Sequence, residues 1–175
     1  PHVCRSGLCV AATPEARMPP SRPACRRGCS HCCHYPVGVS FIESVRLAEA
    51  VRGRPELQRR LQDAGDAASG VSWDDLVGTA CPLLVDDSCA VHDERPMPCR
   101  ALGSLDASAC AEALTSENAP PRDETAWWRG LGAAHAMADG QPSGVRELRA
   151  AVLAILARPD SPQDGFRQAR VAPGS

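Results

Sequence analysis

The chain has 175 residues, a formal net charge of −2 and only 3% aromatic residues. That length allows one domain with its own hydrophobic core, so crosslinks are not needed merely for folding. The near-neutral charge argues against nucleic acid or an anionic membrane as a partner, and no apolar run approaches the roughly 18 residues of a membrane-spanning helix.

Ten cysteines raise three interpretations, namely disulfides, metal ligands and redox catalysis. Disulfide frameworks are typical of short secreted chains, and secretion requires an apolar signal segment. The first thirty residues contain proline and arginine and show no such segment. We therefore expect a cytoplasmic protein whose cysteines bind metal, and rank a disulfide framework well behind.

Residues 1–24 predict an irregular N-terminal arm, because four prolines between positions 14 and 23 prevent a regular helix or a central strand. Cys4 and Cys9 lie in this arm. Their two interpretations are unpaired surface thiols and extra metal ligands that fold back on the domain. We favour surface thiols, because ordering a terminal arm costs conformational entropy.

The stretch from Cys25 to His34 holds four cysteines and two histidines in ten residues, a density that core packing does not require. Thiolate and imidazole are ligands for zinc and iron, and a short loop can turn several of them towards one ion. We predict that this stretch supplies half of a metal site through its cysteines, Cys25, Cys29, Cys32 and Cys33.

Two helices are predicted after the cysteine stretch. Ser40-Phe-Ile-Glu43 fits a capping box, which predicts a helix over about 40–51. Pro55 suits the first turn of a second helix, over about 56–68. Residues 70–80 predict a loop or a short turn.

A second group of cysteines comes from separate local structures. The apolar run 81–85 and the Asp-Asp-Ser turn after it predict a small hairpin within residues 82–92. The two prolines in 95–100 argue against a helix there, so we expect an extended loop that holds its cysteine rigidly. A helix over 107–114 carries the last member of this group, which comprises Cys81, Cys89, Cys99 and Cys110.

The remainder of the chain predicts a scaffold, with a linker over 117–122 and two helices at about 124–138 and 145–157. The fold class that follows is a small, mainly α-helical, irregular and cysteine-rich domain organised by metal, with a short β-hairpin at most. Its predicted parts are the irregular arm at 1–24, a cysteine-cluster metal-binding domain at 25–115, a C-terminal helical pair packed on it at 116–158, and a tail at 159–175.

The spacings of the cysteines distinguish among kinds of metal site. Cys25-x3-Cys29-x2-Cys32 matches the motif of radical S-adenosylmethionine enzymes, but the chain lacks the length and the βα alternation of their barrel. Cys29-x2-Cys32 is also one zinc knuckle. The second group has gaps of seven and nine residues, which indicate ligands delivered from separate loops, as in many iron–sulfur or polynuclear sites.

Taken in order, these motifs resemble the YkgJ family, also called CxxCxxCC, a zinc- or iron-chelating domain. The resemblance covers roughly residues 25–110 and rests on the first four cysteines, Glu43, Cys81-Pro-x-Leu84, Cys89-x-x-His92, Arg95-Pro-x-x-Cys99-Arg100 and Cys110. The first gap here has three residues, where the family's name has two. Many relatives carry Tyr at the position of His92, so the resemblance implies no ligand role for that histidine.

The resemblance implies a bound metal, with activities that differ among members. Some members are labelled iron–sulfur oxidoreductases, and a flagellin lysine methylase resembles the same domain. The chain has no G-x-G-x-x-G loop for a nucleotide or S-adenosylmethionine, so we rank methyl transfer low.

Charged and histidine side chains near the cysteines are expected to support the site. His31 and His34 should donate hydrogen bonds to thiolate sulfur rather than bind metal. Arg95 and Arg100 can each offset the mutual repulsion of the thiolates or bind a carboxylate or phosphate substrate, and Arg95 can instead form a salt bridge with Asp93 or Glu94. We favour the offsetting role for Arg100, because it adjoins Cys99. Glu43 is most economically a helix cap.

We predict that eight cysteines converge, namely Cys25, Cys29, Cys32, Cys33, Cys81, Cys89, Cys99 and Cys110. Eight thiolates are too many for one mononuclear site, so two sites, or one polynuclear cluster with a neighbour, are implied. Cys32 and Cys33 would then point apart and serve two metal centres.

The favoured function is an iron–sulfur or iron/zinc protein with a redox or a peptide- or protein-modifying role, and with a protein or peptide substrate or a redox partner. The alternative is a non-catalytic zinc-binding module that acts in protein interaction or metal handling. Whether the protein is an oxidoreductase or any other enzyme stays open at this point.

Overall fold

The computed structural model describes residues 4–5, 8–9, 24–26, 28–116, 122–138 and 144–158. Among them, three 3-10 helices are η2 (His31–His34), η3 (Asp74–Leu76) and η4 (His92–Glu94). Six α-helices carry the fold: α1 (Phe41–Val51), α2 (Pro55–Ala67), α3 (Met97–Ala101), α4 (Ala107–Glu112), α5 (Glu124–Ala138) and α6 (Leu148–Leu156). The prediction of a small, mainly α-helical domain is confirmed.

Strands in the described residues are two residues long and form three antiparallel pairs: β1 (Cys4–Arg5) with β2 (Leu8–Cys9), β3 (Gly38–Val39) with β6 (Arg146–Glu147), and β4 (Leu84–Val85) with β5 (Ser88–Cys89). The β4–β5 pair is the predicted hairpin. Its turn residues Asp86 and Asp87 have φ of 46° and 54°, the left-handed conformation that tight hairpin turns require. The β1–β2 pair is a local departure from the irregular arm, most of which lies outside the described residues.

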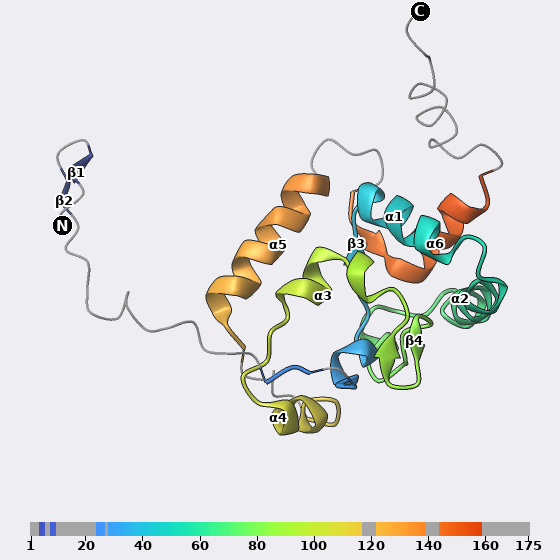
Figure 1. The fold of residues 1–175 in the computed structure, drawn as a ribbon, viewed down its shortest axis with the longest axis horizontal. Coiled ribbons are helices and arrows are strands. Elements are labelled where there is room, and N and C mark those ends of the chain that lie inside the picture. The colour runs from blue at the N-terminus through green and yellow to red at the C-terminus, as the bar shows by residue number, and fades with distance from the viewer. Residues whose placement is uncertain are drawn as a thin grey trace, which may run out of the picture.

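The hydrophobic core lies where α1, α2 and α6 meet. Leu47 and Val51 of α1, Leu61 of α2 and Val152 of α6 are all fully buried. Each such side chain contributes roughly 1.5–3 kcal/mol to folding. Figure 1 shows these three helices on one side of the molecule and α5 beside α3 on the other, with η2 and the hairpin between.

Local signals explain where the main helices begin. Ser40 and Glu43 form the predicted capping box of α1, and Pro55 occupies the first position of α2. The last helix begins at Leu148, three residues later than predicted. It starts later because the two residues before it pair with β3, and the Glu147 side chain then caps the helix.

The extended loop predicted over 95–100 is wrong, because Met97–Ala101 forms α3. Both prolines occupy positions where a helix needs no N–H donor. Pro96 is the N-cap, and Pro98 lies in the first turn. Proline is excluded from the interior of a helix but not from its first turn, and α3 has only five residues.

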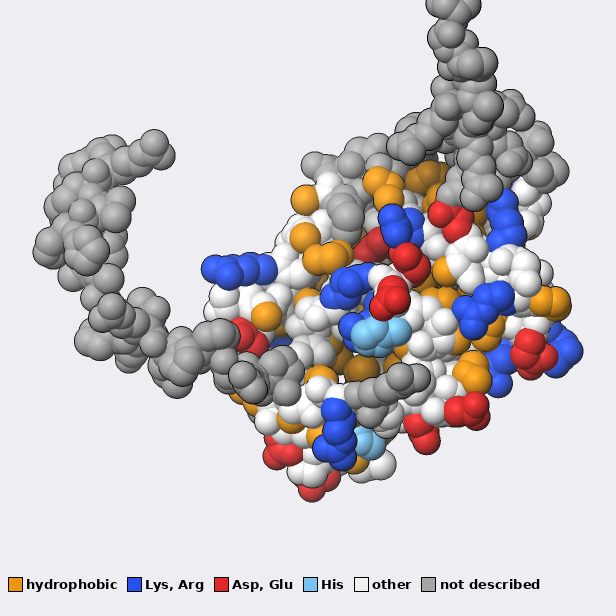
Figure 2. Space-filling model, in the orientation of Figure 1, with side chains coloured by type: hydrophobic (Ala, Val, Ile, Leu, Met, Phe, Trp, Pro, Cys, Tyr) orange, Lys and Arg blue, Asp and Glu red, His pale blue; other side chains and the backbone are white. Residues whose placement is uncertain are grey.

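The surface mixes charges of both signs. On the face seen in Figure 2, basic and acidic side chains are interspersed, with hydrophobic side chains visible between them. Trp128 of α5 is 61% exposed, whereas Trp127 has the guanidinium of Arg122 stacked 4.5 Å from its ring centroid. No helix among the described residues is both long enough and apolar enough to cross a membrane.

Replacing Ser40 with alanine should lower the free energy of unfolding by about 1 kcal/mol, because the first turn of α1 loses a side-chain acceptor. The Ser40 oxygen accepts from the Glu43 N–H and is itself buried. Urea denaturation should show a lower midpoint with an unchanged slope. An unchanged midpoint would mean that this cap does not hold the helix in solution.

Candidate metal centre

The N-terminal cysteine stretch folds into the tight turn η2, which contains Cys32 and Cys33. Two backbone hydrogen bonds join this turn to the segment that precedes the hairpin. The Cys81 N–H donates to the Cys33 carbonyl at 2.7 Å, and the Gly78 N–H donates to the His34 carbonyl at 2.8 Å. These bonds fix Cys81 beside Cys33, although the two lie far apart in the chain.

Cys89 reaches the site on the second strand of the hairpin, where it pairs with Leu84. The hairpin turn is attached to the cysteine stretch by a hydrogen bond from Ser30 Oγ to Asp87 Oδ1 at 3.1 Å. The left-handed turn therefore also directs the Asp87 carboxylate towards Ser30, the N-cap of η2.

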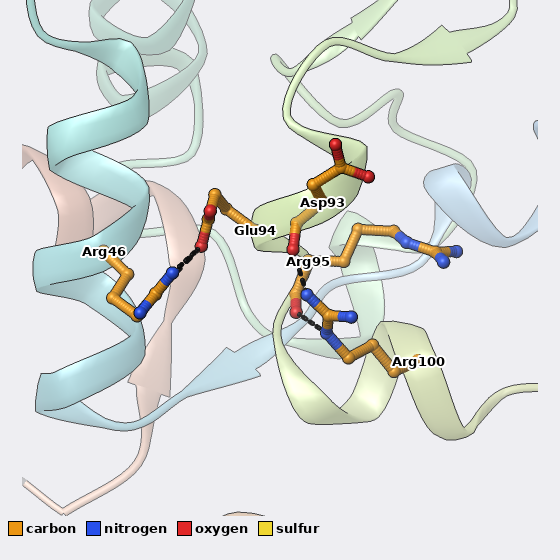
Figure 3. Close-up of polar contacts among 5 residues, drawn as sticks. All are labelled: Arg46, Asp93, Glu94, Arg95 and Arg100. Carbon is orange, nitrogen blue, oxygen red and sulfur yellow. Dashed lines mark hydrogen bonds and ion pairs between the residues drawn. The ribbon is translucent and has the colours of Figure 1, made fainter.

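Cys99 lies in α3, which packs along α5. The guanidinium of Arg100 donates to the backbone carbonyls of Asp93 and Arg95 and so closes the loop before the helix (Figure 3). The turn of a helix, rather than an extended loop, thus determines where this thiol lies.

Cys110 is buried on α4, with 6% of its surface exposed. Asp106 caps this helix by accepting from the N–H groups of Ser108 and Ala109, and the helix packs against η2. Cys25 lies nearer the surface, where its thiol donates to the Leu102 carbonyl at 3.9 Å.

Five thiols lie near enough to others of the set for their charges to affect pKa values, and we call them the inner thiols: Cys32, Cys33, Cys81, Cys89 and Cys99. A hydrogen bond with Cys32 and burial raise the pKa of Cys33, and the charges of Cys81 and Cys89 add to the shift. Burial raises the pKa of Cys99 to about 12, with further contributions from Cys81, Cys32 and Cys89. Burial is also the main cause of the raised pKa values of Cys81 and Cys89.

Cys32 behaves differently from the other inner thiols. A hydrogen bond from the Cys33 thiol lowers its pKa to about 6; burial opposes this shift, while Arg95 and His34 add to it. The thiols of these two adjacent cysteines therefore interact with each other, and their service to two metal centres stays a prediction.

A second, smaller group surrounds Cys110, and we call it the outer thiols: Cys25, Cys29 and Cys110. Burial raises the pKa of Cys110, and the charges of Cys25, Cys29 and Cys32 raise it further. Cys32 thus interacts with both groups. All eight cysteines of the two groups are free thiols, and the side chains of Cys4 and Cys9 lie outside the described residues.

The donor set suits zinc or iron. Within the described ranges, no three Cys, His, Asp or Glu side chains are already grouped around one point closely enough to hold a metal ion. The thiols are neighbours, and most have raised pKa values, so the thiolate form is costly in these buried surroundings. A cation stabilises the thiolate, and sulfur is the preferred donor for zinc and iron–sulfur centres. By their chemistry, the residues present fit such a centre.

Arg95, rather than Arg100, supplies the positive charge near the inner thiols. Its guanidinium points away from Arg100 in Figure 3, and Glu94 pairs with Arg46 instead. The charge of this arginine lowers the pKa of three inner thiols, Cys32, Cys89 and Cys99. Both arginines bond backbone carbonyls, Arg95 through Nε to that of His92 at 3.0 Å, so these bonds do not distinguish them. The role expected for Arg100 is wrong because Arg95, and not Arg100, is the arginine whose charge acts on these three thiols.

The side-chain partners of His34 and His92 are oxygen atoms. His34 Nδ1 is 3.2 Å from the Ser30 carbonyl oxygen, within the same turn of chain. His92 is exposed, and its ring faces the Asp93 carboxylate at 3.5 Å. Hydrogen bonding of His31 and His34 to thiolate sulfur stays a prediction.

The sequence predicted one of the two roles of Glu43. Its role in the capping box is confirmed, but its second carboxylate oxygen accepts from the Met97 N–H at 2.7 Å. The partners are 54 positions apart, so no local signal identifies this bond.

No curated protein and no solved structure matches the chain. A family model does match residues 24–118, namely CxxCxxCC, with the description "Putative zinc- or iron-chelating domain". The matched range is more than half of the chain and contains both thiol groups, and it ends before α5 and α6. As its ordered motifs predicted, the chain belongs to the CxxCxxCC family of zinc- or iron-chelating domains.

Proposed function

We propose that the inner and outer thiols hold iron, as an iron–sulfur cluster or together with zinc, and that the protein has a redox or a protein-modifying role. The observation that carries this proposal is the proximity of five inner thiols from four separate segments of the chain, with Cys81 held beside Cys33 by a backbone hydrogen bond. Four thiolates complete one tetrahedral ion or one cluster, so eight thiols exceed a single mononuclear site.

The same interactions support a division into two neighbouring centres. The outer thiols would supply three ligands, and Cys32 lies within electrostatic reach of both groups. Bound iron would supply electron transfer, whereas bound zinc would supply a crosslink or a Lewis acid. The protein's own residues would bind the metal through sulfur, and Arg95 would offset the negative charge of the assembled thiolates.

A protein or peptide substrate, or a redox partner, suits this surface better than nucleic acid does. The formal net charge is −2, and charges of both signs are interspersed on the face in Figure 2. Nucleic acid binding depends on a basic patch. The eight free thiols support a reducing compartment such as the cytoplasm.

Metal and sulfide content tests the proposal, measured by mass spectrometry and sulfide assay on anaerobically purified protein. Iron with matching sulfide and a broad visible absorption band is the expected result, because iron–sulfur centres absorb visible light. Zinc alone without colour would instead favour the non-catalytic zinc module, for which the Cys29-x2-Cys32 knuckle is the supporting feature. A folded protein that retains neither metal would overturn both functions.

A further inference from the structure

A single buried carboxylate connects two helices near the inner thiols. Glu43 lies in the first turn of α1 and is 8% exposed. Its Oε2 accepts from the N–H and the hydroxyl of Ser40, both at 2.8 Å. Its Oε1 accepts from the Met97 N–H at 2.7 Å, so both oxygens have donors from different parts of the chain.

The second bond caps a helix that has no cap of its own. Met97 is the first residue of α3, and its N–H has no partner within the helix. The N-cap, Pro96, provides no side-chain acceptor, and Pro98 has no N–H. Glu43 therefore supplies from α1 the acceptor, and the negative charge, that the start of α3 requires.

This start determines the position of an inner thiol. Cys99 lies two residues after Met97 in the same helical turn, and its thiol interacts with Cys32, Cys81 and Cys89. The helix has five residues, so a shift of its first residue carries the cysteine with it.

A second contact joins α1 to η4, the short helix that precedes α3, and it is weaker. Arg46 pairs with Glu94, but their side chains are 62% and 33% exposed. Exposed ion pairs contribute little, because water screens them and two long side chains must be ordered. The buried bond of Glu43 is therefore the stronger connection between the core helices and the segment that carries Cys99.

We propose that Glu43 is a positioning residue for the metal centre, which fixes the thiol of Cys99 through the backbone of Met97. The inference rests on the proposed function, since it assigns a role towards the metal. A glutamine side chain has one acceptor oxygen, whereas two backbone N–H groups, those of Ser40 and Met97, donate to Glu43. The NH2 group of the amide would therefore face one of these donors and could not accept its hydrogen bond.

Zinc affinity of the metal-free protein, measured by competition with a chelator, tests the proposal. Glu43→Gln should weaken zinc binding by about ten-fold or more, the usual effect of losing a group that orients a ligand. Ser40→Ala breaks the other half of the same capping box and leaves the Met97 bond intact. It should therefore weaken binding by no more than about five-fold, the equivalent of one lost cap.

A double-mutant cycle separates positioning from general destabilisation. If Glu43 acts through Cys99, Glu43→Gln should weaken zinc binding much less in a Cys99→Ser background than in the wild type. Equal losses in both backgrounds, or equal losses in Glu43→Gln and Ser40→Ala, would overturn the proposal. Arg46→Gln is a further control and should bind zinc as the wild type does.

Glu43→Asp covers the case in which the glutamine variant does not fold, as judged by circular dichroism. Aspartate keeps the charge in the first turn of α1 but is one methylene too short to reach Met97, so the same loss of affinity is expected. A wild-type protein that binds no metal would end the proposed function and this inference together. Metal binding that is lost in Cys99→Ser but unchanged in both Glu43 variants would end this inference alone.

Discussion

Serine in place of Cys32 should remove most of the bound metal and lower the thermal unfolding midpoint sharply. Cys32 interacts with the inner thiols and with Cys110 of the outer group, so its loss should affect both of the proposed centres. Serine is nearly the same size, but its hydroxyl does not supply a thiolate. Metal binding to a structural site can supply roughly 10 kcal/mol to folding, and the variant should lose a large part of it.

Metal content by mass spectrometry and thermal unfolding with and without a chelator measure this effect. The chelator should lower the midpoint of the wild type towards that of Cys32→Ser and should change the variant little. Cys4→Ser and Cys9→Ser serve as matched controls, since we expect these thiols not to bind metal. Full metal retention in Cys32→Ser would contradict the proposed site, and metal loss in either control would add the N-terminal arm to it.

Alanine in place of Gly130 should destabilise the protein by about 1–3 kcal/mol, the usual cost of overpacking a close interface. Gly130 is buried where α5 crosses α3. A Cβ added there would lie less than 3.0 Å from the Cβ of Ala101 and 3.4 Å from its Cα. Because that contact includes backbone, the two helices would have to separate.

Gly132, two residues further along the same helix, is the matched control. A Cβ there meets nothing within 4 Å, so alanine should stabilise the helix by up to about 1 kcal/mol. The two variants should therefore shift the thermal midpoint in opposite directions, by roughly 2–4 °C per kcal/mol for a chain of this size. Equal stability of both variants would show that α5 does not pack on α3 through Gly130.

Helix starts were predictable because their signals are short in range. The Ser40–Glu43 box and Pro55 each act within one turn of chain, so the residues that cause the helix are beside it in the sequence. The helix at Met97–Ala101 was missed because the rule against proline holds for a helix interior, and here both prolines lie at the start.

Adjacency in the sequence misled where side-chain direction mattered. Arg100 follows a predicted ligand directly, yet Arg95 is the arginine whose charge acts on the thiols. Cys32 and Cys33 were expected to point apart and so to serve two metal centres. In the 3-10 turn their thiols interact with each other.

By itself, the sequence determined the helical fold class, the family and the types of residue available to a metal, because capping signals and cysteine spacing are local properties of the chain. Only the tertiary structure decided which thiols form the inner and the outer group, since Cys81 bonds the backbone of η2 and Cys89 and Cys99 come within electrostatic reach of Cys32 from distant segments. The same reason applies to Glu43, whose second partner lies 54 positions away. Spacing shows which groups are present, but only packing brings groups from separate segments within range of one another.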